Sequence, residues 1–357
     1  MHSASIVVWS TDIEQAHGQA IMTRRIATEL LPKFAQTKLC VFPEGLYLWR
    51  WLSAIVRLYA FVLCASKPIV YIACSRSRLG FVRDVPALLL ALLGVRVVVH
   101  VHGADFITMF DDPVIGRLAH FCYRNCEVIM ISRHLFGRAA TIPFKRLYLC
   151  ENYAVPPLAM ESHTTSPPLH ITVLWNSNLM ASKGIIEALK AFETVSGNIS
   201  GVSMHVLGRA IGDEELTAEA VQACVDRYND VENIEILGPV SPEDSIIALN
   251  SADIVILPSR YSAEAQPLAV VQAMILGKSV VLTDTPALKS TAENYPAYFA
   301  SSAAVPDLAV ALERAIVDLR DFGDLTKSKH EKAREIAEQR FSINRFDREL
   351  VGILLQD

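Results

Sequence analysis

DIVILPSRYSAEAQPLAVVQAMILGKSVVLTD, residues 253–284, contains two short apolar runs. A polar loop and a longer apolar segment lie between them. The runs DIVILP and SVVLTD are continuous rather than alternating, which is typical of parallel strands buried on both faces. Between them, PLAVVQAMILG opens with proline and closes with glycine, which predicts a helix. The stretch therefore predicts a strand–loop–helix–strand unit of an open α/β sheet.

The loop of this unit, SRYSAEAQ, carries a candidate binding site. Ligands of open α/β sheets bind beyond the carboxyl ends of the strands, and free N–H groups at a helix start attract phosphate. Glu264 lies in the loop, and Gln272 lies eight residues later in the helix. A carboxylate would repel a phosphate. Its presence there therefore suits a ligand that also carries neutral hydroxyls, which the carboxylate can bind. A sugar nucleotide combines these groups, so we predict a nucleotide-sugar site.

The same residues resemble the E-x7-E region of the family-four retaining glycosyltransferases, which have the GT-B fold. The matches fall in one register and are Pro258, Ser259, Glu264, Pro267, Leu268, Ala273, Met274, Gly277 and Val280. The resemblance implies that Glu264 contacts the transferred sugar and that Gln272, in place of the second glutamate, holds the ribose hydroxyls. A neutral hydrogen bond is worth ~0.5–1.5 kcal/mol against ~1.5–3 for a charge-assisted one. We therefore expect weaker donor binding.

A second match opens the C-terminal half, where SNLMASKG aligns with the family pattern G-R-L-x-x-x-K-G. The resemblance implies that Lys183 binds the diphosphate and stabilises it as it leaves, an electrostatic effect that dominates many such sites. The alternative, a surface lysine at a helix start, is disfavoured by the helix dipole. Asn178 replaces the family arginine, and Arg209, directly after Gly208, is a candidate for the missing charge. The remaining donor-binding candidates are Pro239 and Val240 beside the nucleobase, and Ala265, Gln266, Pro267 and Leu268 at the helix start.

The first half of the chain resembles the family at fewer positions. His102 begins HGAD after the apolar run RVVVHV, and the resemblance places it beside the reaction centre of the sugar. We choose it over His100, because we expect the two histidines to lie on opposite faces of the strand, with His100 in the core. Asp105 belongs to the same loop as His102.

Two other stretches are candidates for acceptor or phosphate binding. His17 and Gly18 lie where the family has a glycine-rich loop, although a single glycine after a strand is more typical of a plain turn. Arg76, Arg78 and Arg83 follow a buried strand in SRSRLGFVRD, which we expect to be a loop. Arginines there suit an anionic acceptor such as a lipid diphosphate. A solvated loop is the alternative.

YLWRWLSAIVRLYAFVLCASK, residues 47–67, is apolar and aromatic with inserted basic residues. About 20 uninterrupted apolar residues are needed to cross a bilayer, and Arg57 lies in the middle of the segment, so a membrane span is disfavoured. Two interpretations stay open, a core helix of the first domain and a helix that lies in a membrane interface.

The length of 357 residues suits two domains. With the resemblance, we predict two doubly wound Rossmann-like domains facing across a cleft. Residues 1–158 bind the acceptor, residues 159–335 bind the donor, and a C-terminal helix in 336–357 packs back on the first domain. Residues 154–170 are rich in Pro, Ser and Thr and are interpreted as the linker, which Asn152 precedes as in the family.

Charge and motif content disfavour several function classes. The net charge of −5 divides into +7 for residues 1–158 (17 basic, 10 acidic) and −12 for the remainder (16 basic, 28 acidic), which predicts an anionic surface or ligand for the first half. No basic run or binding motif indicates nucleic acid. The sequence has no G-x-G-x-x-G for a nicotinamide cofactor and no D-x-D for a metal-bridged diphosphate. We expect no metal and no cofactor beyond a UDP- or GDP-type co-substrate.

Seven scattered cysteines and the lack of a secretory signal predict reduced thiols and a cytoplasmic location. A peripheral position on the inner face of the cell membrane is the alternative. Together, these features predict a retaining, metal-independent hexosyltransferase that acts on a glycan or lipid-linked acceptor in bacterial polysaccharide or glycolipid biosynthesis. A nucleotide-sugar epimerase of the same fold stays open, as does a binding protein with degenerate catalysis, which Gln272 and Asn178 favour.

Overall fold

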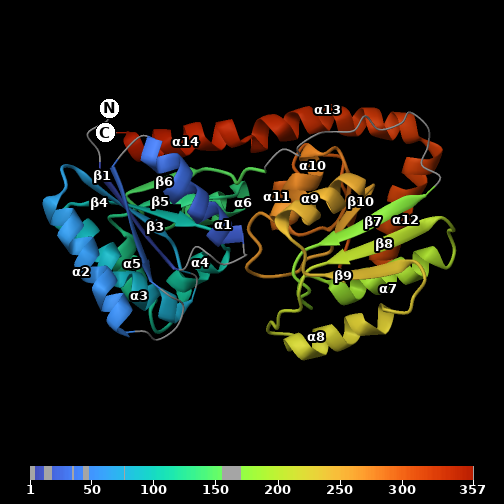
Figure 1. Cartoon of the computed structure of the whole chain (residues 1–357), viewed down its shortest axis with the longest axis horizontal. Helices are drawn as coiled ribbons and strands as arrows, with labels where there is room; N and C mark the ends of the chain where they lie inside the picture. Colours follow the sequence, from blue (N-terminus) through green and yellow to red (C-terminus); the bar gives the residue numbers. More distant parts are fainter. Residues whose placement is uncertain are drawn as a thin grey trace. The chain divides into compact units, whose positions relative to one another are not determined.

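The chain folds into two compact units (Figure 1). The structure, a computed structural model, describes residues 5–11, 18–33, 36–42, 48–75, 77–154 and 170–356. The first unit consists of Met1–Asn152 and Asn344–Asp357, and the second of Tyr153–Ile343. Most of the predicted linker therefore lies outside the described residues. Among all the residues that the structure describes, no helix combines the length and the apolar character that a bilayer span requires.

Six parallel strands form the sheet of the first unit, in the order β2-β1-β3-β4-β5-β6. The strands are β1 Ser5–Thr11, β2 Gln36–Phe42, β3 Pro68–Ala73, β4 Arg96–Val101, β5 Glu127–Met130 and β6 Arg146–Leu149. The helices are α1 Gly18–Arg25, α2 Leu48–Cys64, α3 Arg78–Leu88, α4 Asp105–Thr108, α5 Gly116–Tyr123, α6 Arg133–Ala139 and α14 Ile343–Leu355. The central strands β1, β3, β4 and β5 are almost wholly buried, as their continuous apolar sequences predict.

The second unit has the same plan, with parallel strands in the order β12-β11-β10-β7-β8-β9. The strands are β7 Ile171–Asn176, β8 Val202–Leu207, β9 Ile234–Gly238, β10 Ile254–Leu257, β11 Ser279–Thr283 and β12 Tyr298–Ala300. The helices are α7 Ile185–Ser196, α8 Ala218–Val225, α9 Pro242–Ser251, α10 Leu268–Ile275, α11 Pro286–Thr291, α12 Val305–Asp321 and α13 Gly323–Phe341. The predicted α/β class with two doubly wound parallel sheets is confirmed.

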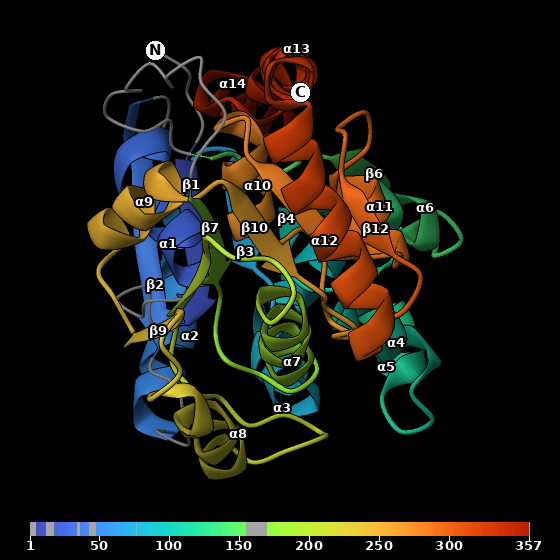
Figure 2. The same ribbon diagram turned by 90° about the vertical axis from the view of Figure 1, so that its right-hand side faces the viewer.

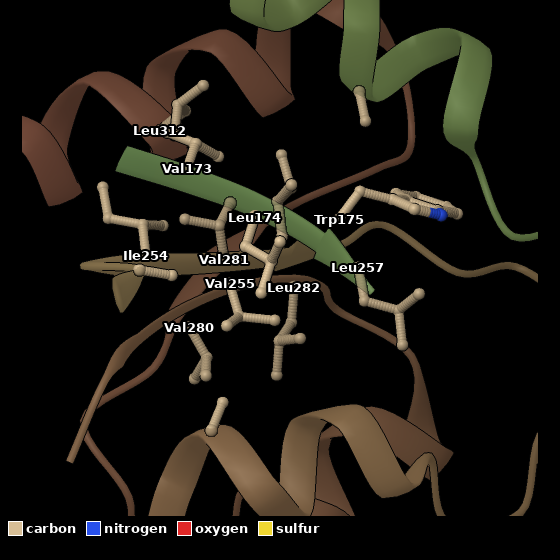
Figure 3. Close-up of a cluster of buried hydrophobic side chains, with 14 of the residues drawn as sticks. Val173, Leu174, Trp175, Ile254, Val255, Leu257, Val280, Val281, Leu282 and Leu312 are labelled. Carbon is tan, nitrogen blue, oxygen red and sulfur yellow. The ribbon is translucent and has the colours of Figure 1, made fainter. Parts of the chain in front are cut away.

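The core of the second unit lies on both sides of β7, β10 and β11. Figure 3 shows apolar side chains of these strands, such as Leu174 and Val281, between helices above and below, with Leu312 of α12 reaching toward Val173. Helix α12 packs against α7 and β12 (Figure 2), and α10 packs against α13. At the start of α9, Ser241 accepts a hydrogen bond from the N–H of Asp244 and caps the helix.

The predicted loop SRSRLGFVRD is largely a helix, which corrects the sequence interpretation. Ser77 accepts a hydrogen bond from the N–H of Gly80 at 3.0 Å, and this cap begins α3 at Arg78. Arg78 pairs with Asp112, with 2.6 Å between Nε and Oδ2, and Arg83 donates to the hydroxyl of Ser75. The polar residues of this stretch were interpreted as a loop, although Ser77 caps the start of a helix.

Helix α14 returns the end of the chain to the first unit. The C-terminal helix predicted in 336–357 is divided, because α13 ends at Phe341 and α14 begins at Ile343 after an extended residue. The two terminal guanidinium nitrogens of Arg25 each lie 2.6 Å from an oxygen of the Asp347 carboxylate. Arg96 donates to the last carbonyls of α14, where a cation suits the helix dipole, and also pairs with Glu127.

Lys278, directly before β11, is almost fully buried and donates to the carbonyl of Asn250 at 2.7 Å. Burial lowers the pKa of Lys278 from 10.5 to about 8, against the opposing effect of the Asp253 carboxylate. Between these two pH values the unfolded chain binds a proton that the native state does not, so the free energy of unfolding rises with pH there. Below pH 8 the buried cation destabilises the fold by roughly 3 kcal/mol relative to pH above 10.5.

Replacing Lys278 by methionine is therefore expected to raise the free energy of unfolding at neutral pH by roughly 2 kcal/mol, since the lost hydrogen bond offsets part of the gain. It should also flatten the dependence on alkaline pH. Urea unfolding at neutral pH and near pH 10 measures both effects. Lys190→Met, an exposed lysine of α7, is the control. Identical pH slopes in the wild type and K278M would contradict this account.

Candidate functional site

The candidate site lies where the strand order of the second sheet reverses. Strands β7 and β10 are neighbours in the sheet but not in the sequence, and the chain continues from them toward opposite edges. Ligands of open α/β sheets bind beyond the carboxyl ends of the strands at such a switch point. The loop after β7 carries Lys183, and the loop after β10 carries Glu264. The fold therefore places the two principal candidates at the expected edge.

Lys183 and Glu264 are in contact. The Nζ atom of Lys183 lies 3.5 Å from Oε2 of Glu264 and donates to the hydroxyl of Ser177 at 3.1 Å. Ser259 donates to the same carboxylate oxygen at 3.3 Å. The side chains of Lys183 and Glu264 are only 16% and 11% exposed, so Lys183 is not a solvated surface lysine. Removing either partner leaves a mostly buried charge without compensation.

Two glycines allow three loops to touch through their backbones. Gly184 is left-handed (φ 84°) at the N-cap of α7, and a Cβ there would lie 2.6 Å from the carbonyl oxygen of Pro258. Gly208, after β8, has φ 132°, and a Cβ would lie 2.0 Å from the carbonyl oxygen of Ser177. Side chains cannot be accommodated at such distances without backbone movement, so the glycines set the spacing of the loops around Lys183.

Asp213 ties the loop after β8 to the residue before Lys183. Its carboxylate accepts a hydrogen bond from the N–H of Ser182 at 2.8 Å and two more from Glu215 and Leu216. Burial alone raises the pKa of Asp213, but these hydrogen bonds outweigh it, the one from Ser182 being the largest, and lower the pKa to about 2. Asp213 is therefore ionised at every physiological pH and holds this loop contact closed.

Arg260, in the loop after β10, ties that loop to the loops after β7 and β8. Its N–H donates to the carbonyl of Ser182 at 2.9 Å, and its guanidinium pairs with Glu215 and, at 3.2 Å, with Glu187 of α7. Ser177, Asp213 and Arg260 were absent from the sequence prediction. No motif marks them, and Asp213 and Arg260 act through partners on different loops.

The other donor-binding candidates differ in their exposure. Pro267 lies at the N-cap of α10, one residue before the helix that was predicted to begin with it. The N–H of Leu179, next to Asn178, donates to the carbonyl of Arg209 at 2.9 Å, so these two candidates lie on touching loops. Ala265, Gln266 and Pro267 are buried, Asn178, Gly208, Leu268 and Gln272 are half-buried, and Arg209, Pro239 and Val240 are exposed.

In the first unit, the expectation that His100 and His102 point to opposite faces is wrong. Their ring centroids lie 4.3 Å apart, because residues two apart in a strand share a face. His102 directly follows the end of β4, whereas His100 is fully buried, with its Nδ1 2.6 Å from the Tyr71 hydroxyl. Burial holds the pKa of His100 well below its usual range, and the neighbouring His102 lowers it further. Asp105 begins the short helix α4.

The remaining first-unit candidates are His17, Gly18, Arg76 and Arg78. His17 and Arg76 lie outside the described residues, and Gly18 begins α1. Arg78 is engaged by Asp112, which is held in turn by the N–H groups of Val114 and Ile115. Across the described ranges, no group of three or more His, Cys, Asp or Glu side chains is arranged to hold a metal ion.

Known proteins resemble this chain in the sequence of its second half and in its overall fold. Residues 166–338 match the family described as Glycosyl transferases group 1. No curated protein matches the sequence. Similar solved structures include sucrose-phosphate synthase from Thermosynechococcus elongatus, with 14% identity, 98% coverage of both chains and a TM-score of 0.73. Anabaena HepE in complex with UDP-glucose also has 14% identity and a TM-score of 0.73, over 98% of this chain and 99% of that one.

A third structure is an α,α-trehalose-phosphate synthase (UDP-forming) from Burkholderia xenovorans in complex with glucose-6-phosphate, with 11% identity over 96% of this chain and 99% of that one, and a TM-score of 0.62. These likenesses show the two-domain α/β fold expected of GT-B glycosyltransferases. The family match over 166–338, which contains Lys183 and Glu264, supports a glycosyltransferase.

Proposed function

We propose that the chain is a retaining glycosyltransferase that moves a sugar from a nucleotide-diphosphate sugar to a hydroxyl of a glycan or lipid-linked acceptor. The contact between Lys183 and Glu264 at the switch point carries this proposal. A cation suits a diphosphate and a carboxylate suits sugar hydroxyls, and a nucleotide sugar presents both groups a few ångströms apart. The match of residues 166–338 to a glycosyltransferase family supports the same reaction class.

In this proposal, donor binding separates the pair of charges. The Nζ atom of Lys183 exchanges Glu264 and Ser177 for diphosphate oxygens, and Glu264 accepts hydrogen bonds from hydroxyls of the transferred sugar. Gln272 of α10 holds the ribose, and Arg209, exposed on the neighbouring loop, supplies the second positive charge. Around them, Asn178, Gly208, Ala265, Gln266, Pro267 and Leu268 contact the diphosphate and sugar, and Pro239 and Val240 contact the nucleobase.

The proposed reaction keeps the configuration at the anomeric carbon. The bond from that carbon to the diphosphate oxygen breaks as an oxocarbenium ion develops, and the acceptor oxygen attacks from the side of the leaving group. The departing diphosphate takes the acceptor proton, so no protein base is required, and His102 orients the sugar. Lys183 stabilises the growing negative charge on the diphosphate, which makes the proposed reaction metal-independent.

UDP-glucose is the first donor to test, because HepE is described with UDP-glucose and the trehalose-phosphate synthase as UDP-forming. GDP sugars are the second choice. We propose that the acceptor is a glycan or a lipid-linked sugar met in the cytoplasm or at the inner membrane face. The positive first half of the chain, +7 over residues 1–158, supports an anionic acceptor or surface.

Thermal melting with a panel of UDP and GDP sugars tests the proposal. A ligand at a hundred times its Kd stabilises the native state by about 2.7 kcal/mol, which raises the melting temperature by about 5–11 °C for a domain of this size. Slow release of nucleoside diphosphate with the same donor indicates a transferase. Binding without release would favour the degenerate binding protein instead, and conversion of the donor sugar would favour an epimerase. A panel without any shift would refute the proposal.

Replacing Gln272 by glutamate is expected to tighten donor binding about fivefold. A charge-assisted hydrogen bond to a ribose hydroxyl is stronger than a neutral one by about 1 kcal/mol. Titration calorimetry with the donor found in the panel measures the change. Gln339→Glu, on the exposed side of α13, adds the same charge elsewhere in the second unit and should leave the Kd unchanged. Weaker binding by Q272E would remove Gln272 from the ribose site.

A further inference from the structure

Helix α2 of the first unit buries one side and exposes an apolar stripe on the other. Ala54 and Leu58 are fully buried on the side that packs against the sheet. Opposite them, Trp49 is 82% and Leu63 84% exposed, and Val56 lies between these two on the same side of the helix. Neither sequence interpretation of residues 47–67 is complete, because this helix is part core and part exposed apolar surface.

The orientation of this stripe is fixed by hydrogen bonds to α3. The indole N–H of Trp51 donates to the carbonyl of Arg83 at 3.0 Å, and the hydroxyl of Tyr59 donates to the carbonyl of Pro86 at 3.0 Å. These polar anchors hold the buried side of α2 in place. The exposed apolar side chains are therefore a fixed feature of the folded unit.

Helix α3, the neighbour of α2, also exposes apolar side chains. It packs beside α2 (Figure 1), and it leaves Leu79, at 78% exposure, and Val82 open to solvent. We name the exposed residues of the two helices the α2–α3 surface; they are Trp49, Leu52, Val56, Leu63, Leu79 and Val82. Monomeric proteins rarely expose large contiguous apolar patches unless the patch contacts a membrane or a partner.

The charge around the surface selects its partner. Arg50 and Arg57 are exposed on α2, on the flank of the apolar stripe, and the helix contains no acidic residue. An apolar face bordered by arginines and carrying tryptophan is the composition of helices that lie in a membrane interface. Anionic lipid head groups attract such arginines, whereas a neutral apolar partner would gain nothing from them.

We propose that the α2–α3 surface docks the first unit onto an anionic lipid bilayer. Trp49, Val56 and Leu63 enter the boundary between head groups and acyl chains, and Arg50 and Arg57 contact lipid phosphates. The docking does not depend on the proposed glycosyl transfer, because lipid binding is measured without a donor sugar. The two proposals can therefore fail separately.

Flotation of the full chain with vesicles tests the docking. Binding is expected to vesicles of equimolar phosphatidylcholine and phosphatidylglycerol and to weaken in high salt, because screening shortens the range of the attraction. Binding to pure phosphatidylcholine should be much weaker. Trp49 fluorescence should shift to shorter wavelength on binding, whereas the fully buried Trp9 and Trp175 should not respond.

Three variants locate the contact. R50Q/R57Q should weaken binding to the anionic vesicles about thirtyfold, because each basic residue near such a surface contributes about a factor of five. W49S/V56S/L63S should weaken it by more than tenfold, since the inserted apolar area is lost. The matched control I247S/V310S/I336S changes three exposed apolar residues of the second unit and should bind as the wild type does.

Several results would overturn the proposal. Equal binding to both kinds of vesicle would remove the charge argument, and equal binding by wild type and both α2 variants would move the contact elsewhere. If the α2 variants instead convert a wild-type dimer to a monomer without lipid, measured by light scattering, the surface joins two copies of the chain. Circular dichroism of each variant distinguishes loss of fold from loss of binding. We expect every variant to fold, because all the altered residues are exposed.

Discussion

Replacing Lys183 by alanine is expected to lower kcat for release of nucleoside diphosphate by about 10²–10³-fold. The lysine contacts Glu264 at the switch point and in the proposed mechanism neutralises the leaving diphosphate. Steady-state rates with the donor identified by thermal melting measure the loss. Lys190→Ala removes an exposed lysine of α7 and should leave kcat unchanged. Normal turnover by K183A would remove Lys183 from the mechanism.

A double-mutant cycle separates chemistry from stability in the same pair. K183A leaves the carboxylate of Glu264 mostly buried without its cation, which is expected to lower the free energy of unfolding by about 1–3 kcal/mol. K183A/E264Q removes both charges and should be more stable than K183A alone, because the two effects are not additive for residues in contact. Its activity should be no higher than that of K183A. A double variant less stable than both single variants would show that the ion pair is not the relevant coupling.

Gly208→Ala is expected to destabilise the second unit by roughly 3–5 kcal/mol. The new Cβ would lie 2.0 Å from the carbonyl oxygen of Ser177, in a backbone conformation with φ 132° that L-residues rarely adopt. Differential scanning calorimetry measures the resulting change in the melting transition of the second unit. Gly352→Ala is the matched control, because no atom lies within 4 Å of a Cβ there on α14, and helical alanine should stabilise by about 0.5–1 kcal/mol. A G208A melting temperature equal to that of the wild type would contradict the steric argument.

Much of the fold was predictable because its signals are local. Continuous apolar runs identify the buried parallel strands, and the pair Ser241 and Pro242 marks the start of α9 within a few residues of sequence. The errors arise where the same residue types serve two structures. Ser77 caps a helix in a stretch that resembles a loop, and the face that α2 exposes depends on its neighbours rather than on its own apolar pattern.

The candidate site was predictable only in part. Glu264 was predicted from its loop before a helix start and Lys183 from the resemblance to the family pattern, and the structure brings the two side chains into contact. Asp213 and Arg260 hold the surrounding loops through partners far away in the sequence, so no local pattern identifies them. The error at His100 and His102 has a different origin, because the two-residue period of a strand requires a shared face.

The return of α14 to the first unit has a consequence for biosynthesis. Arg25 and Arg96 find their partners on α14 only after all of residues 153–343 have been synthesised. Until then, the ribosome-bound N-terminal portion lacks the α14 partners of these two arginines and exposes the apolar surface that Phe346 and Leu350 later cover. The first unit therefore completes its folding only after the second unit has been synthesised, because its helix α14 follows the second unit in the sequence.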